Sequence, residues 1–434
     1  MAEPWVPLLG ASVLIAIGFL AAQVFERFRL PDYVILIAVG IALGSGVLPL
    51  GAWSPAPLLV AGQPFLLSVA IAFILFEGGL ALHLRGVGRT WGLAALHTVL
   101  AIVLSVAGAW LAGVAILGLT STTSLILALA MCAPSAAIVL SVLPRIRVTD
   151  RTRLALTLEG VLGNVIAAAL VLSLVRFPGG FPAGTALVPF AINAAAAFSL
   201  AAGVGLVWDR LIGAAKPRSF LYMTSVAIAI LVYAVAEGFL GGNGGLAAFA
   251  FGLVLGHWGP AGALDATVPT SGSRGLQEFH KEIVFVLRTF FFVSLGLLID
   301  VSRISVQALA GAVVLVIVFA LARLPTTTAL ARSWSLPRTD VRALRAVVAR
   351  GLTDTVLVLY AIAVGVIPAY EAGLVADLLV MVVLLGAFVS AVLVVRAQSG
   401  PAHSQPPTDQ GAPPQPSPDV GSASSNSNHG NSPP

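Results

Sequence analysis

The chain has 434 residues, of which 58% are hydrophobic and only 9% are charged. An ordinary soluble domain carries about 25% charged residues, so this composition argues against a soluble protein and predicts an integral membrane protein. The net charge of +5 does not indicate nucleic-acid binding, because the basic residues are spread over loops rather than gathered in one patch. Cys132 is the only cysteine, so an internal disulfide bond is excluded.

The first residues, MAEPW, contain Glu3 but no Lys or Arg, which is not the pattern of a secretory signal peptide. We therefore expect a retained first transmembrane helix. Apolar segments of about 18 or more residues, cut at clusters of charge, Pro and Gly, predict an all-α polytopic fold with about 13 spans. In chain order they lie near residues 5–25, 32–50, 64–82, 91–117, 122–143, 154–175, 185–208, 219–240, 244–259, 282–300, 304–331, 344–367 and 371–395. The ninth is short and rich in glycine.

The distribution of Lys and Arg predicts how these spans are oriented. With the N-terminus outside, 18 of the 23 basic residues fall on the cytoplasmic side. Only Arg176 and Arg303 fall in outer loops, while Arg288, Arg323 and Arg350 lie within spans. This alternation fits an odd number of spans and places the C-terminus in the cytoplasm.

The fifth span contains the segment MCAPSAAIVLSVLP, which places Pro134 and the small residue Ser135 near the middle of a helix. Proline removes a backbone donor and clashes with the preceding turn, so the helix is expected to kink or break here. A break exposes backbone groups, which are tolerated within a membrane only when they are buried in protein or line a cavity. A simple proline kink is the alternative.

The sixth span carries two polar residues, Glu159 and Asn164, in an otherwise apolar run. An ionisable side chain within a span costs ~2.5–3.5 kcal/mol on insertion scales and indicates a functional site with a partner. Arg288 in the tenth span and Arg323 in the eleventh are the candidate partners, and Arg323 lies deeper. Because a Glu–Arg pair relieves both charges, the sequence favours a structural ion pair between Glu159 and Arg323. The alternative is an interfacial Glu at a helix end.

The twelfth span contains the segment VVARGLTDTVLVLYAIAV, in which Arg350, Thr353 and Asp354 interrupt an apolar run. We interpret it as a second broken helix. Spans 5 and 12 hold the same place in the first and last groups of six, which predicts two inverted six-helix repeats joined by span 7. Interrupted helices at corresponding positions of two halves point to a transporter site near the bilayer midplane.

Other sequence features narrow the function. Glu77 near the cytoplasmic end of span 3 suits an interfacial role as well as a functional one. No phosphate-binding loop, metal-ligand spacing or nucleophile–base set is visible, so we expect no cofactor, no metal site and no enzyme activity. We expect residues 1–396 to form the membrane domain. Residues 397–434, rich in Pro, Ser, Gly and Asn, are expected to be a disordered cytoplasmic tail.

Five segments, spread from about Phe19 to Val395, carry a family resemblance. They are FERFRLPDYVILIAVGIALG, ILFEGGLALHLRGV, RTFFFVSLGLLID, ARLPTTTAL and VVARGLTDTVLVL. In this order and spacing they resemble the sodium/proton exchanger family of the monovalent cation:proton antiporter superfamily, in its bacterial form.

The resemblance implies an antiporter fold with a dimerisation domain and a moving core domain, in which two broken helices cross. It implies exchange of Na⁺, Li⁺ or K⁺ for H⁺ by alternating access, usually by a homodimer of the inner membrane, and a role in pH homeostasis. The family's sixth-span Glu falls on Glu159 and its eleventh-span Arg on Arg323, which form an ion pair within the core. Its Arg-Gly motif falls on Arg350 and Gly351.

Two family motifs are altered. The Asn-Asp pair of span 6 is replaced by Gly163 and Asn164, and the Thr-Asp-Pro of span 5 by a Pro-Ser-Ala run around Ser135. Cation–proton competition needs a group that binds either ion, and an Asn side chain cannot take up a proton at physiological pH. Glu159 in an ion pair is a poor proton carrier, so Asp354 is the replacement that we predict.

Two other functions remain open. Loss of two carboxylates while Arg288, Arg323 and Arg350 are kept would favour a transporter of an anion or other small solute on the same scaffold. A non-transporting membrane sensor that kept the fold is the other alternative.

Overall fold

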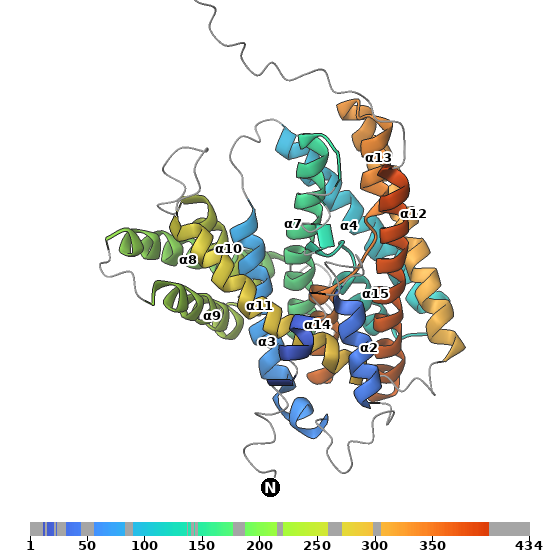
Figure 1. The fold of residues 1–434 in the computed structure, drawn as a ribbon, viewed down its shortest axis with the longest axis horizontal. Helices are drawn as coiled ribbons and strands as arrows, with labels where there is room; N and C mark the ends of the chain where they lie inside the picture. Colours follow the sequence, from blue (N-terminus) through green and yellow to red (C-terminus); the bar gives the residue numbers. More distant parts are fainter. Residues whose placement is uncertain are drawn as a thin grey trace, which may run out of the picture. The chain divides into compact units, whose positions relative to one another are not determined.

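The structure is a computed structural model, and it describes residues 12–13, 15–20, 23, 32–44, 56–82, 90–136, 138–139, 143, 146–176, 187–214, 220–258, 271–297 and 305–398. The expected cytoplasmic tail and parts of several predicted spans lie outside these residues. Every regular element within them is helical (Figure 1). The helices are α2 (Asp32–Gly44), α3 (Ala56–Ala81), α4 (Thr90–Ala115), α5 (Ser121–Ala130), α7 (Asp150–Arg176), α8 (Leu187–Ala214), α9 (Leu221–Phe239), α10 (Gly244–Trp258), α11 (Ser271–Leu297), α12 (Val306–Trp334), α13 (Arg338–Ala346), α14 (Leu352–Ala363) and α15 (Ala369–Gln398).

Long apolar helices establish the membrane class. Among the described residues, six are long and apolar enough to cross a bilayer, namely the apolar segments within α4, α7, α8, α9, α12 and α15. Shorter apolar helices occur in α3, α5, α10 and α14. The all-α membrane architecture is therefore confirmed, whereas the count of thirteen spans stays a prediction.

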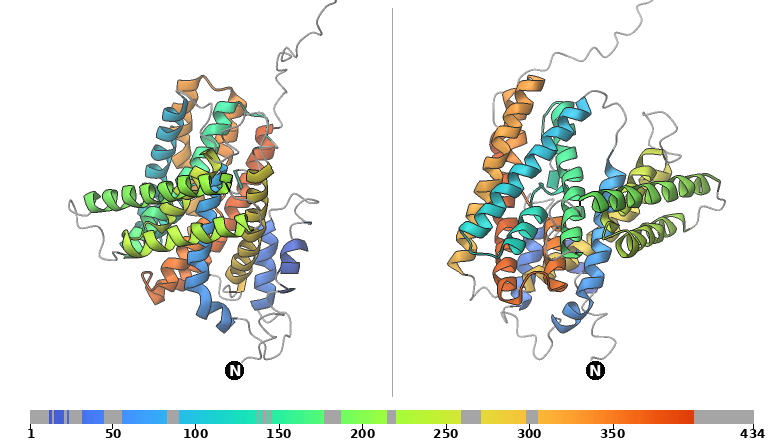
Figure 2. Two further views of the ribbon diagram at one scale, coloured as in Figure 1. Left: turned by 90° about the vertical axis from the view of Figure 1, so that its left-hand side faces the viewer. Right: turned by 180° about the vertical axis from the view of Figure 1, so that it is seen from behind.

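Helix α7 is the most enclosed of the six, since 78% of its apolar segment is buried. It contacts α3, α4, α5, α10, α13 and α14, so protein surrounds it on several sides, as the three views of the ribbon show (Figures 1 and 2). Its buried residues are distributed all round the helix, which is the pattern of a helix inside a protein core. Glu159 and Asn164 are thus placed in protein rather than in lipid.

Glycine allows two pairs of helices to approach closely. A Cβ atom on Gly40 of α2 would lie 2.8 Å from the Cα of Gly296 in α11. A Cβ atom on Gly79 of α3 would lie 2.6 Å from the backbone nitrogen of Leu253 in α10. Such contacts suit a membrane protein, where close packing rather than hydrophobic burial drives helix association.

Two helices are interrupted. Helix α5 ends at Ala130 and is followed by non-helical residues 131–135. Helices α13 and α14 are separated by the non-helical segment Val347–Gly351, which runs between them in the ribbon (Figure 1). Both interruptions fall where the sequence indicated a break.

Two acidic residues from the last part of the chain hold the starts of helices from its first half. Glu371 of α15 accepts hydrogen bonds from the backbone nitrogen of Thr120 (2.7 Å) and from its hydroxyl (3.0 Å), at the start of α5. Asp340 of α13 accepts hydrogen bonds at the start of α7, from the Thr149 nitrogen (3.1 Å), the Thr149 hydroxyl, and the Thr152 hydroxyl (2.8 Å). Each satisfies orphan donors at a helix N-terminus.

Replacing Asp340 with Ala is expected to destabilise the protein by about 1–3 kcal/mol, because the buried Thr152 hydroxyl loses its acceptor. The readout is the thermal unfolding midpoint in detergent, followed by tryptophan fluorescence. Replacing Asp150, which is exposed in the first turn of α7, with Ala is the matched control and should cost no more than about 0.5 kcal/mol. Equal unfolding midpoints for the two variants would show that the Asp340 hydrogen bonds do not contribute to the stability of the protein.

Candidate ion site where the two interrupted helices meet

The two interruptions touch each other. The backbone nitrogen of Ser135 donates to the carbonyl oxygen of Ala349 (3.1 Å), which links one break to the other. A Cβ atom on Gly351 would lie 2.7 Å from the Cβ of Ser135, so glycine is required for this close approach. The nitrogen of Val348 donates to the Ser390 hydroxyl of α15 (2.9 Å). We call this meeting point of residues 131–135 and 347–351 the crossing.

Asp354 lies at the start of α14, beside the crossing. It is fully buried, and its Oδ2 accepts a hydrogen bond from the Gly351 nitrogen (2.6 Å). Its other oxygen, Oδ1, has no hydrogen-bond partner among the described residues. Our placement of Asp354 within the break is corrected, because the break covers Val347–Gly351 and Asp354 belongs to the first turn of α14. The reason is that Asp354 caps α14: its carboxylate accepts from the nitrogen of Gly351, the N-cap residue, so the helix already begins at Leu352. Thr353 is buried beside it in the same turn.

Arg350 lies in the break itself and is 1% exposed. Its guanidinium group lies 4.1 Å from the centre of the Phe319 ring, a cation–π contact with α12. Its Nε and Nη1 atoms have no hydrogen-bond partner within the described part of the chain. Arg350 interacts electrostatically with Asp354, which places opposite charges on the two sides of Gly351.

Arg323 and Glu159 form a bidentate ion pair. Nη1 of Arg323 contacts Oε1 of Glu159 at 2.5 Å, and Nη2 contacts Oε2 at 2.8 Å. The Nε and Nη2 atoms of the same guanidinium donate to the carbonyl oxygen of Leu344 at 3.0 and 2.7 Å. Arg323 therefore joins α7, α12 and the last turn of α13, just before the break. Both charged side chains are buried, so loss of either one would leave the other as an uncompensated buried charge.

His97 of α4 also contacts this pair, and sequence reasoning missed it. Its Nε2 lies 3.6 Å from Oε2 of Glu159, and the residue is 4% exposed. The signal available in the sequence was an isolated imidazole in an apolar span, but its partner lies on another helix and no local spacing reveals it.

Asn164 lies one turn and a half beyond Glu159 on α7 and is also buried. Neither its amide nitrogen nor its amide oxygen has a hydrogen-bond partner in the described residues. At the preceding position, a Cβ atom on Gly163 would lie 2.5 Å from the Cβ of Ala133. Glycine here lets α7 pack directly against the non-helical residues that follow α5.

The secondary candidates lie on other helices. Glu77 is half-buried on α3, and Arg288 is half-buried on α11. Arg288 is not the partner of Glu159, since Arg323 contacts both oxygens of that carboxylate. Among the described residues, no group of three or more His, Cys, Asp or Glu side chains is arranged to hold a metal ion.

Comparison with known proteins identifies the family. A model of the sodium/hydrogen exchanger transmembrane family matches residues 12–397. The chain belongs to this family. The resemblance drawn from the five sequence segments is thereby confirmed, and the family is one of membrane transporters rather than of enzymes.

Individual relatives support the same assignment. The chain is 26% identical over 321 residues to the K⁺/H⁺ antiporter NhaP of Alkalimonas amylolytica, which covers 72% of this chain and 53% of that protein. It is 26% identical over 313 residues to the K⁺/H⁺ antiporter NhaP2 of Shewanella sp. strain MR-4, covering 68% of this chain and 50% of that protein. The chain thus spans about half the length of the curated relatives that it matches.

The fold is similar to that of a solved antiporter. The structure of the sodium proton antiporter MjNhaP1 from Methanocaldococcus jannaschii at pH 8 superposes with a TM-score of 0.72 and 18% sequence identity. The match covers 91% of this chain and 99% of that chain. At this identity the likeness establishes the fold.

Proposed function

We propose that the protein exchanges a monovalent cation, Na⁺, K⁺ or Li⁺, for H⁺ by alternating access. The observation that carries this proposal is the buried carboxylate of Asp354 beside the crossing, with one oxygen held by the Gly351 nitrogen and the other without a hydrogen-bond partner among the described residues. A carboxylate in this state binds either a proton or a cation, and antiport requires that competition.

In this mechanism the fixed oxygen positions the side chain while the second oxygen binds the ions. Oδ2 remains with the Gly351 nitrogen, so α14 stays capped in both states of the site. Oδ1 alternately binds the proton and the cation. The amide oxygen of Asn164 and the hydroxyl of Ser135, both buried, are the further oxygen ligands that we propose for the cation.

Glu159 and Arg323 act as the frame of this site. The hydrogen bonds from Arg323 use both carboxylate oxygens of Glu159, so Glu159 has little capacity left to carry a transported ion. We propose that the pair holds α7, α12 and α13 together as the core moves. His97 is the additional neighbour of this frame.

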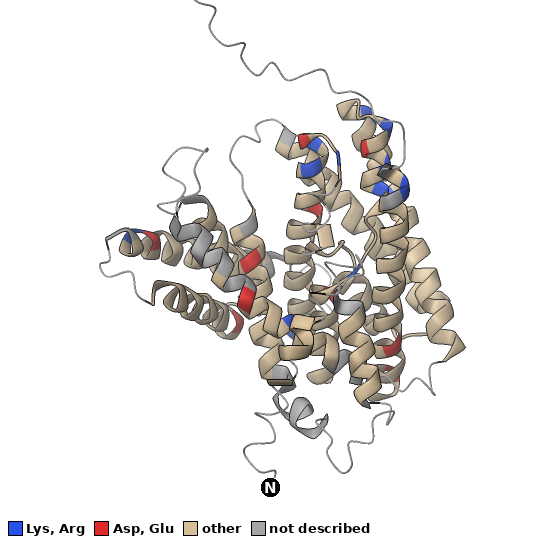
Figure 3. Ribbon diagram, in the orientation of Figure 1, with Lys and Arg blue, Asp and Glu red and all other residues tan. Residues whose placement is uncertain are grey.

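We also propose thirteen spans in two inverted repeats, an outward N-terminus, a cytoplasmic C-terminus and a homodimer in the inner membrane. The paired caps support the repeats. Inverted repeats would relate α5 to α13 and α7 to α15, and so would relate the contact between the starts of α5 and α15 to the contact between the starts of α13 and α7. Gathering of arginines at one end supports the orientation. Figure 3 shows basic residues gathered around α13 and the start of α7. The arginines of these segments and of the adjoining ends of α12 and α15 are Arg147, Arg151, Arg153, Arg332, Arg338, Arg342, Arg345 and Arg396.

Replacing Asn164 with Asp is expected to lower the cation concentration for half-maximal exchange by about tenfold. A carboxylate ligand attracts the cation more strongly than the amide oxygen that it replaces, and a net gain of ~1.4 kcal/mol corresponds to this tenfold change. The change nearly preserves side-chain volume, so folding should persist. The measurement is the cation dependence of proton flux in vesicles, with Asn243→Asp as the matched control at another buried Asn. An unchanged half-maximal concentration would place Asn164 outside the ion site.

One observation favours a second candidate, transport of an anion. Arg350 is a buried guanidinium whose Nε and Nη1 atoms have no hydrogen-bond partner among the described residues. Such a group suits recognition of a planar or phosphate-like anion. Its attraction to Asp354 and its contact with Phe319 already offset part of its charge, which makes this the weaker proposal.

The two candidates are separated by one assay. Inside-out vesicles are acidified, and a pH-sensitive dye reports proton movement when Na⁺, K⁺ or Li⁺ is added in turn. Dequenching with at least one cation, absent in vesicles without the protein, supports the antiporter. No response to any cation, together with uptake of a labelled anion, would favour the second candidate instead.

A further inference from the structure

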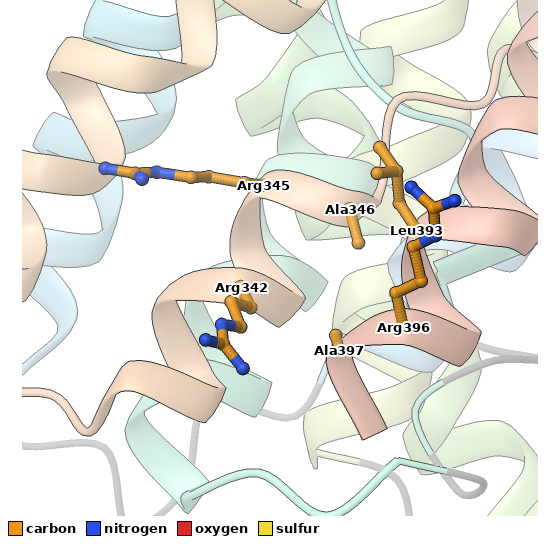
Figure 4. Close-up of a pocket in the computed structure, with 6 residues that line it drawn as sticks. All are labelled: Arg342, Arg345, Ala346, Leu393, Arg396 and Ala397. Carbon is orange, nitrogen blue, oxygen red and sulfur yellow. The ribbon is translucent and has the colours of Figure 1, made fainter. Parts of the chain in front are cut away.

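A cavity lies away from the crossing, at the arginine-rich end of α13 and α15. It has a volume of about 290 Å³ and is lined by Arg342, Arg345, Ala346, Leu393, Arg396 and Ala397. The stems of the arginines and the three apolar side chains form its walls. Figure 4 shows Arg342 on α13 and Arg396 on α15 extending from opposite sides, and Arg345 extending away from the other two.

The three guanidinium groups differ in what they contact. Arg345 donates from Nε to the Thr327 hydroxyl (3.1 Å) and from Nη2 to the Thr328 hydroxyl (2.8 Å), so α12 fixes it without neutralising its charge. Arg342 and Arg396 are exposed, and neither makes a hydrogen bond or an ion pair with the described part of the chain.

No carboxylate on α12, α13 or α15 offsets this charge. Asp340 on α13 is buried and directed to Thr149 and Thr152. Helix α12 contains no acidic residue. The acidic residues of α15, Glu371 and Asp377, lie roughly 28 Å or more along the helix from Arg396.

We propose that this cavity binds a phosphate-bearing anion, with the phosphate between Arg342 and Arg396 and its apolar attachment over Leu393, Ala346 and Ala397. Guanidinium groups bind phosphate oxygens through paired hydrogen bonds, and the apolar floor accommodates a glycerol or acyl group. A basic pocket between transmembrane helices suits the headgroup of an anionic phospholipid. A soluble phosphate has the same recognition chemistry, and the test below distinguishes the two sources. The ligand would tie α13, which leads into the break, to the end of α15.

The test uses the full chain purified in a neutral detergent and stripped of lipid. Its thermal unfolding midpoint is titrated with phosphatidylglycerol, with phosphatidylcholine and with inorganic phosphate, for the wild type, for R342Q/R396Q and for R332Q/R338Q. The last variant is the matched control, because Arg332 and Arg338 are exposed at the same end but do not line the cavity. Bound lipid is counted in parallel by native mass spectrometry.

Phosphatidylglycerol should raise the midpoint of the wild type and of R332Q/R338Q, while phosphatidylcholine should not. R342Q/R396Q should require about 30-fold more phosphatidylglycerol for the same rise, since each arginine near an anionic lipid contributes roughly 1 kcal/mol. A rise with inorganic phosphate at similar concentration, also lost in R342Q/R396Q, would support the site with a soluble phosphate as its source. Equal responses of the two double variants to phosphatidylglycerol would overturn the proposal. So would the absence of any response of the wild type to phosphatidylglycerol and to inorganic phosphate.

Discussion

Replacing Arg323 with Gln should lower the free energy of unfolding by about 3–5 kcal/mol, the largest loss of stability expected from a single change in this protein. The change leaves the buried carboxylate of Glu159 without its ion-pair partner. It also removes the hydrogen bonds that Arg323 donates to the Leu344 carbonyl at the end of α13. The thermal unfolding midpoint and the yield of monodisperse protein measure the effect.

A double variant separates loss of the pair from loss of the arginine. E159Q/R323Q carries no buried charge at this position, so it should be more stable than R323Q alone. R332Q, at the exposed end of the same helix, is the matched control and should change stability by no more than about 0.5 kcal/mol. If R323Q unfolds at the same temperature as R332Q, the ion pair does not hold the core together.

Replacing Asp354 with Asn should reduce proton-coupled cation flux to the level of vesicles without the protein, because the amide binds no proton at physiological pH. The amide oxygen can still accept the hydrogen bond from the Gly351 nitrogen, so the cap of α14 is kept and the protein should remain folded. Fluorescence of a pH dye in reconstituted vesicles gives the flux, and size-exclusion chromatography with thermal unfolding confirms the fold.

Two variants make the result specific. D354E retains a titrating carboxyl and should retain part of the flux, whereas D150N removes an exposed carboxylate outside the site and should retain all of it. Folded D354N with wild-type flux would show that another group carries the proton. His97, which contacts Glu159, would then be examined first.

Much of the fold could be predicted from the sequence because long apolar runs identify transmembrane helices almost without regard to context. The runs in α4, α7, α8, α9, α12 and α15 were all located this way. The interruptions near Pro134 and Gly351 were also readable, since Pro and Gly act on the backbone locally. The boundaries were less accurate. The predicted twelfth span began at residue 344, whereas α13 begins at Arg338, because a short polar helix gives no signal of apolar length.

The site was less accessible to sequence reasoning because its contacts join distant segments. Glu159 and Arg323 are 164 residues apart in the sequence. Their ion pair could be predicted only because a charged side chain within a transmembrane span is costly unless it has a partner. The cap from Glu371 to Thr120 spans 251 residues and leaves no local pattern. The contact of His97 with Glu159 could not be predicted for the same reason. The role of Asp354 as a cap became visible only when the first residue of α14 was known.

The central claim, exchange of a monovalent cation for protons, is tested most directly by isotope uptake driven by a pH gradient. Proteoliposomes with an acidic lumen are diluted into alkaline buffer containing ²²Na⁺ or ⁸⁶Rb⁺, and uptake is followed over time. We predict accumulation of at least one isotope in wild-type vesicles, its collapse when the pH gradient is dissipated, and its absence in D354N vesicles. Uptake of neither isotope by folded wild-type protein, or uptake that persists without a pH gradient, would contradict the account.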